Sequence, residues 1–121
     1  MHTVIETPTF LRKALEAGMS EMERFELVSS LGEEPALGDL IKGTGGVRKV
    51  RFGGKGKGKS GAYRAITFYS STSLPVFLLT VYAKGAKVNL TKAECNALGK
   101  LCERLESTYA SKVVQLSSRA G

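Results

Sequence analysis

The stretch from Gly43 to Arg64, GTGGVRKVRFGGKGKGKSGAYR, most constrains what this chain can fold into. Residues 42–64 hold eight of the eighteen lysines and arginines, eight of the fourteen glycines and no acidic residue. Glycine destabilises the interior of a helix or strand, and the positive charges repel one another, so this stretch is a poor candidate for a packed core. A chain tolerates both features where it holds an anion at close range, which makes nucleic acid or another phosphate ligand the first hypothesis.

The other charges are divided unevenly along the 121 residues. Residues 1–41 hold three basic and eight acidic residues, whereas residues 65–121 hold seven basic and three acidic ones. A basic cluster is the electrostatic feature expected of a surface that binds phosphate backbones, and the alternative is that the net charge only maintains solubility. The length predicts one domain, residues 1–121. The chain has no apolar run of membrane-spanning length and no signal-peptide pattern, which predicts a cytoplasmic protein.

Two short helices are predicted near the N-terminus. Thr7 and Pro8 have the residue types of an N-cap and a first helical position, and Gly18 marks the end of this helix. Ser20 and Glu23 match a capping box that opens a second helix, which Gly32 would end. Their short link predicts a helical hairpin. The apolar faces expected are Phe10, Leu11, Ala14 and Leu15 on the first helix, and Met22, Phe25, Val28 and Leu31 on the second.

Beyond Pro35 the pattern favours strands joined by short links, which predicts an antiparallel meander. The strands expected are Asp39–Lys42, Val47–Phe52, Ala62–Ser70 and Leu74–Lys84, with Val4 and Ile5 as a further short candidate. Leu74–Lys84 is apolar on both faces, so we expect it inside the sheet. Thr91 and Glu94 match a capping box that opens a third helix. Its apolar stripe is Cys95, Leu98, Leu101, Cys102, Leu105 and Tyr109, and its last residues are expected to fray.

One motif match has the wrong surroundings for its usual function. Residues 53–60, GGKGKGKS, fit the phosphate-binding P-loop pattern, which requires a helix directly after the loop. The following segment is rich in β-branched and aromatic residues and lacks helical period, so we predict a hairpin loop instead. Its alternating lysines and glycines either grip a sugar–phosphate backbone without reading sequence or form a solvated loop.

Arg64 lies among apolar neighbours, on the same strand face as Ile66 and Phe68. A charge in such a place needs a partner, so Arg64 either forms a structural ion pair or contacts a scissile phosphate. The sequence does not favour histidine acid–base catalysis, because His2 is the only histidine. It does not favour a metal site either, because no cluster has metal-ligand spacing. Cys95 and Cys102 would lie about 10 Å apart along a helix, too far for a disulfide.

A family resemblance joins these pieces. The ordered series Gly43-Thr44-Gly45-Gly46-Val47-Arg48-Lys49, then residues 56–61 (GKGKSG), then Arg64, then residues 78–84 (LLTVYAK) resembles the HigB branch of RelE-like bacterial toxins. The resemblance runs from about Val4 to Tyr109. It implies an α+β fold, with an N-terminal helical hairpin packed on a small antiparallel sheet and a C-terminal helix. It also implies a ribosome-dependent mRNA endonuclease, needing no metal or other cofactor, in which the RNA 2′-OH attacks the adjacent phosphate.

The same resemblance implies roles for individual side chains. Lys57, Lys59, Arg64 and Lys84 match the catalytic cations, with Arg64 on the scissile phosphate and crowding by Lys55 able to lower a neighbouring lysine pKa. The tyrosine that stacks on a base in this family has no clear counterpart, which leaves Tyr69 and Tyr82 as candidates. Tyr109 is expected in the core. The remaining RNA-binding candidates are Arg48, Lys49, Arg51 and Lys55.

The resemblance further implies two kinds of partner. One is mRNA on the ribosome, with contacts to 16S rRNA, and the other is a cognate antitoxin of the helix-turn-helix type. The antitoxin would bind either the basic groove or the outer helices. The alternative function is a non-catalytic nucleic-acid-binding module or a ParE-like gyrase poison. A binder should lose affinity gradually as Lys57, Lys59, Arg64 and Lys84 are removed, whereas an enzyme should lose its rate abruptly at one or two of them.

Overall fold

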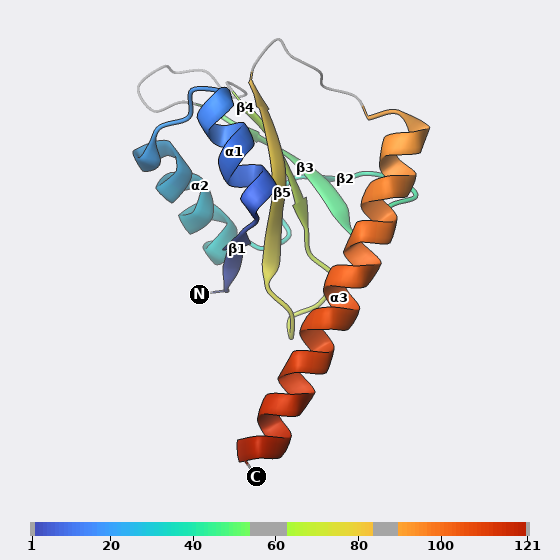
Figure 1. Cartoon of the computed structure of the whole chain (residues 1–121). Helices are drawn as coiled ribbons and strands as arrows, with labels where there is room; N and C mark the ends of the chain where they lie inside the picture. The colour runs from blue at the N-terminus through green and yellow to red at the C-terminus, as the bar shows by residue number, and fades with distance from the viewer. Residues whose placement is uncertain (1, 54–62, 84–89, 121) are drawn as a thin grey trace.

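A computed structural model of the chain describes residues 2–53, 63–83 and 90–120, with only the backbone described for residues 110–120 (Figure 1). A five-stranded sheet has the helical hairpin on one face and the C-terminal helix on the other. The predicted α+β class is confirmed. The elements are β1 (Val4–Glu6), α1 (Pro8–Glu16), α2 (Glu21–Glu33), β2 (Asp39–Leu40), β3 (Val47–Phe52), β4 (Tyr63–Phe68), β5 (Val76–Ala83) and α3 (Lys92–Ala120).

The sheet is mixed rather than purely antiparallel. Its strand order is β1-β5-β4-β3-β2, and the four later strands form the predicted antiparallel meander. The prediction of an antiparallel sheet was wrong at one edge, where β1 pairs parallel to β5 with Val4 opposite Val76. The helical hairpin follows β1 directly, so the chain crosses over the sheet and returns through β2 instead of turning back beside β1. As predicted, β5 lies inside the sheet, between β1 and β4.

The predicted start signals of both N-terminal helices are confirmed, and so is Gly18 after the first helix. The hydroxyl of Thr7 accepts the Phe10 N–H at 3.2 Å, and Pro8 is the first residue of α1. After α1, Gly18 has a φ of +80°, a conformation that favours glycine. Ser20 and Glu23 form a complete capping box before α2. These local devices fix where each helix begins and how the hairpin turns.

The predicted apolar face of α2 is confirmed at Val28 and Leu31 but wrong at Met22 and Phe25. Its buried residues are Leu27 and Leu31, whereas Met22 and Phe25 are 63% and 67% exposed. The helix carries apolar residues on more than one side, so spacing alone did not show which side meets the sheet. Gly32 is also not the end, since it is buried within a helix that runs to Glu33.

On α1, the inner face is likewise narrower than predicted. Phe10 and Ala14 are buried, but Leu11 and Leu15 are exposed. A helix on a sheet buries only the stripe that faces the strands, and the two leucines lie beside that stripe. They therefore belong to the outer surface of the hairpin.

The long helix α3 packs on the second face of the sheet. Cys102 is buried there, and Leu98, Leu105 and Tyr109 pack against the same cluster as Ile66 and Phe77, which confirms the expected core position of Tyr109. Leu101, which widened the predicted stripe, is 38% exposed. Both cysteines are free thiols. In the described part of the chain, no helix is long and apolar enough to cross a membrane.

Hydrogen bonds of Thr44 and the backbone conformation of Gly46 fix the GTGG turn before β3. The Thr44 hydroxyl donates to the Ile41 carbonyl at 2.6 Å and accepts the Val47 N–H at 3.1 Å. Gly46 has a φ of +131°, and a Cβ there would come within 3.0 Å of the Phe68 ring. Only glycine fits this turn without strain. The strand that carries the basic residues therefore starts at a fixed point.

Candidate nucleic-acid interface

The strand register aligns three of the predicted site residues in one row. Arg51 of β3 lies opposite Arg64 of β4, and Arg64 lies opposite Tyr82 of β5. Residues directly opposite each other on neighbouring strands have Cβ atoms about 4.5–5.5 Å apart and share one face of the sheet. We call Arg51, Arg64 and Tyr82 the arginine row. It is formed by three segments that are distant in the sequence.

The arginine row lies on the same face as α3. Ile66 and Phe68 follow Arg64 by two and four residues on the same face of β4, and both are buried in the cluster beneath this helix. Tyr82 packs against the edge of that cluster. Lys49 lies two residues before Arg51 on this face. Arg51 is exposed and Arg64 is half-buried. Two like charges directly opposite each other destabilise a sheet. An anion bound beside Arg51 and Arg64 would offset the repulsion between them.

The predicted catalytic lysines follow the last residues of β3 and β5 in the sequence. The next register position beyond the row is Phe52, Tyr63 and Ala83. The β3–β4 connection therefore leaves and re-enters the sheet beside the arginine row, and Lys84 directly follows Ala83 in sequence. Lys55, Lys57, Lys59 and Lys84 themselves lie outside the described residues. The antiparallel pairing of β3 with β4 agrees with the hairpin prediction and not with a P-loop.

Tyr63 ties the start of β4 to the helical hairpin. Its hydroxyl lies 3.2 Å from Glu23 Oε1 and 3.4 Å from the Gly18 carbonyl oxygen. Burial, and then the charge and hydrogen bond of Glu23, raise the pKa of the Tyr63 hydroxyl, so it stays protonated and acts as a donor. On the backbone side, the Tyr63 carbonyl accepts a hydrogen bond from Arg64 Nη1 at 3.4 Å. Tyr63 thus helps to place Arg64, a role that sequence reasoning missed.

The structure does not bring Arg48 and Tyr69 to the row. Along β3, the Arg48 side chain points to the face opposite that of Lys49 and Arg51. Its guanidinium donates to the Tyr69 carbonyl at 3.3 Å. It also lies 5.8 Å from the centroid of the Tyr69 ring. Tyr69 packs against the cluster beneath the helical hairpin. The two residues therefore contact each other on the opposite face, and their part in RNA binding stays a prediction.

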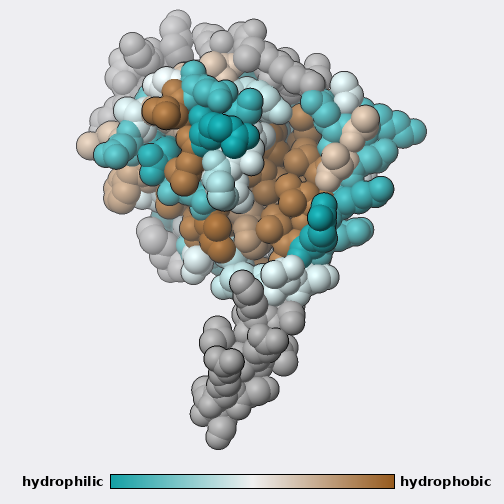
Figure 2. All heavy atoms as spheres, in the orientation of Figure 1, coloured by the Kyte–Doolittle hydropathy of each residue, from teal (hydrophilic) through white to brown (hydrophobic). Residues whose placement is uncertain are grey.

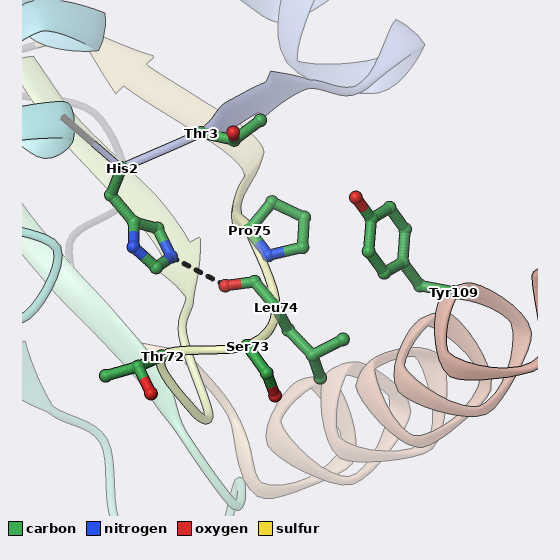
Figure 3. Close-up of a pocket in the computed structure, with 7 residues that line it drawn as sticks. All are labelled: His2, Thr3, Thr72, Ser73, Leu74, Pro75 and Tyr109. Carbon is green, nitrogen blue, oxygen red and sulfur yellow. Dashed lines mark hydrogen bonds between the residues drawn. The ribbon is translucent and has the colours of Figure 1, made fainter. Parts of the chain in front are cut away.

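His2 lies near this second group rather than near the row. Its Nε2 donates to the Leu74 carbonyl at 2.6 Å, and its ring meets the Tyr69 ring edge-on. A small cavity of about 190 Å³ adjoins it, with Tyr109 of α3 on the far side of Pro75 (Figure 3). The cavity is lined by uncharged polar and apolar side chains besides His2. Its chemistry does not match a phosphate site.

The described residues contain no metal-binding cluster, and the buried thiol of Cys102 is not activated. No group of three or more histidines, cysteines, aspartates or glutamates there could hold a metal ion. Burial, assisted by the negative charge of Glu106, raises the pKa of the Cys102 thiol to about 12. This thiol therefore stays protonated at neutral pH and is a poor nucleophile.

Comparison with known proteins gives two findings. The model of the family described as "RelE toxin of RelE / RelB toxin-antitoxin system" matches residues 3–120. Among solved structures, a mutant of the E. coli toxin RelE in the free state is similar, with 15% sequence identity and a TM-score of 0.49. That match covers 70% of this chain and 84% of the other.

Proposed function

The chain belongs to the RelE toxin family, and from this premise we propose that it is a ribosome-dependent mRNA endonuclease of the HigB branch. It would cleave mRNA in the ribosomal A site and so inhibit translation in the cytoplasm. The family match spans nearly the whole chain, which supports residues 1–121 as one toxin domain. The toxin–antitoxin family also implies an antitoxin, which we propose to be of the helix-turn-helix type.

The observation that carries this proposal is the arginine row. Cleavage by the 2′-OH of RNA builds negative charge on the phosphate that it attacks. Fixed positive groups aimed at that position stabilise the transition state more than the ground state. Arg64, in the middle of the row, is the proposed contact of the scissile phosphate. Arg51 adds a second charge beside it, and Tyr82 offers an aromatic face to a base.

We assign proton transfer to lysines of the segments that follow β3 and β5 in the sequence. Lys57, Lys59 and Lys84 are the proposed base and acid candidates, without a metal or other cofactor. A lysine works as a base near neutral pH only when its pKa is lowered, which neighbouring cations do. Lys55 and the arginine row would supply such cations. Lys49 and Lys55 are proposed to hold the RNA backbone, where contacts give affinity rather than sequence preference.

A cell-free translation assay tests the proposal. Purified protein is added to a translating extract, and the 5′ ends of a reporter mRNA are mapped by primer extension. We expect cuts within codons that appear only while ribosomes translate. The variant Arg64→Ala should lower the cleavage rate by about 10²–10³-fold, as expected when one preorganised charge donor is removed.

Lys13→Ala is the control, because it removes a positive charge from the surface of α1, which packs on the opposite face of the sheet. We expect it to retain cleavage, and circular dichroism checks that both variants fold. Undiminished cleavage by folded R64A would reject the assignment of Arg64. Intact mRNA with unaffected translation, from folded wild-type protein, would reject the nuclease and favour a non-catalytic binder.

A further inference from the structure

An apolar groove lies between α1 and α3 (Figure 2). Its floor is β5, through Leu79, Thr80 and Tyr82, and one wall is Leu98, Leu101 and Leu105 of α3. The other wall is residues 7–9 at the start of α1. The groove has a volume of about 470 Å³, which lies within the range of roughly 300–1,000 Å³ found for pockets that enclose a ligand. Figure 2 shows hydrophobic surface in the hollow and hydrophilic surface on both sides.

A positive charge lies next to each wall of this groove. Arg12 follows Pro8 and Thr9 by four and three residues, so it lies on the same side of α1 and is exposed. Arg104 follows Leu101 by three residues on α3 and is exposed as well. At the floor, Tyr82 is shared between the groove and the arginine row. The acid on this side of α3, Glu94, accepts the Thr91 N–H at 2.8 Å in the capping box.

An apolar slot between cations fits a particular kind of occupant. Leucine-like side chains would displace water from the slot, and carboxylates beside them would meet Arg12 and Arg104. Nucleic acid is also negatively charged, but proteins bind its bases by stacking them on aromatic side chains. The slot is walled by three leucines and has one aromatic residue, Tyr82, so it suits bases poorly. The chemistry therefore favours a polypeptide segment over RNA.

We propose that this groove is the docking site of the antitoxin, through an acidic segment whose apolar side chains enter the slot. Because Tyr82 belongs to both surfaces, the bound segment reaches the arginine row and excludes RNA from it. Docking and neutralisation are then one event. The blocking of RNA rests on the proposed function, whereas docking itself does not.

The test measures the affinity of the purified antitoxin encoded with this chain, by isothermal titration calorimetry. Leu101→Asp places a charge on the apolar wall at a position that is already 38% exposed, so folding should survive. We expect at least about a tenfold loss of affinity, as for a residue at the centre of an interface. The control Phe25→Asp makes the same kind of change on α2, at a side chain 67% exposed, and should change affinity less than twofold.

A second pair of variants tests the charges. Arg104→Glu should weaken binding about threefold, with a smaller effect at high salt, because rim charges are screened. Lys92→Glu changes the net charge equally but lies nine residues before Leu101, half a turn around α3, and should have little effect. Equal effects of R104E and K92E would show that only overall charge matters and would overturn the proposal.

Binding of a fluorescein-labelled 12-nucleotide single-stranded RNA separates the remaining outcomes. If L101D weakens RNA binding and leaves antitoxin affinity unchanged, the groove is an RNA surface and the proposal is wrong. If L101D weakens antitoxin binding while wild-type protein fails to cleave mRNA in the translation assay, docking stands and the nuclease function falls. If antitoxin affinity is the same for wild type, L101D and R104E, the docking site lies elsewhere.

Discussion

Two buried threonines, Thr44 and Thr67, should respond in opposite directions to the same substitution by valine. Both are almost fully buried, with exposed fractions of 3% and 0%. Thr44 uses its hydroxyl twice, toward the Ile41 carbonyl at 2.6 Å and the Val47 N–H at 3.1 Å. For the hydroxyl oxygen of Thr67, the described residues provide no hydrogen-bond partner. Valine has nearly the shape of threonine, so each substitution isolates the hydroxyl.

The magnitudes follow from these contacts. Burying a hydroxyl without a partner costs about 1–3 kcal/mol in protein mutational data, so Thr67→Val should raise the free energy of unfolding by about 1–2 kcal/mol. Thr44→Val loses two hydrogen bonds worth about 1 kcal/mol each and leaves two buried backbone groups unpaired. It should lower the free energy of unfolding by about 2 kcal/mol. The two variants should therefore differ by roughly 3–4 kcal/mol in stability.

Urea unfolding followed by circular dichroism measures both changes, provided that the slope of the transition stays constant. Thr80→Val, at a half-exposed position of the same sheet, serves as the control and should stay within about 0.5 kcal/mol of wild type. Thr67 lies on the opposite face from Arg64, so T67V should also keep the mRNA cleavage that we propose for the wild type. A destabilised T67V protein would show that the hydroxyl has a partner in solution and would refute the reasoning.

Three further predictions concern stability and reactivity. Gly99→Ala should raise the free energy of unfolding by about 0.5–1 kcal/mol in thermal unfolding, because a Cβ there lies 3.7 Å from the Thr44 carbonyl oxygen, an ordinary contact in mid-helix. Cys102, whose pKa is raised to about 12, should react with iodoacetamide at pH 8 far more slowly than the less buried Cys95. The raised pKa of Cys102 should also lower the free energy of unfolding as the pH rises above about 9, because the thiol ionises first in the unfolded chain. Glu6→Gln should cost about 0.5–1 kcal/mol at low salt and less at high salt, since it weakens the partly exposed 2.8 Å contact with Arg24.

The elements that sequence could predict are those specified by local chemistry. Caps at Thr7, Ser20 and Thr91 act within three residues, and their hydrogen bonds are present as predicted. The side of α2 that meets the sheet and the parallel pairing of β1 depend instead on contacts far apart in sequence. Local propensity carries no information on those contacts, which is why the first prediction was wrong in part and the second was wrong at that edge.

The arginine row shows the same limit at the functional site. The alternation of Arg64, Ile66 and Phe68 on one strand could be read directly from the sequence. The neighbours of Arg64 on β3 and β5 could not, because they depend on strand register. Register is set by the whole buried pattern, and a shift of one residue moves every side chain to the other face.

An irregularity in the β4–β5 pairing decides which residue of β5 meets Arg64. Thr67 pairs with Leu78, but Ile66 pairs with Thr80, so Leu79 is an extra residue on β5. Regular pairing from Leu78 onward would place Val81 opposite Arg64 and turn Tyr82 toward the helical hairpin. The bulge instead puts Tyr82 beside Arg64 and leaves Leu79 and Thr80 together on the floor of the groove. One inserted residue thus creates both the aromatic end of the arginine row and the apolar surface next to it, which is why the proposed RNA site and the proposed antitoxin site share Tyr82.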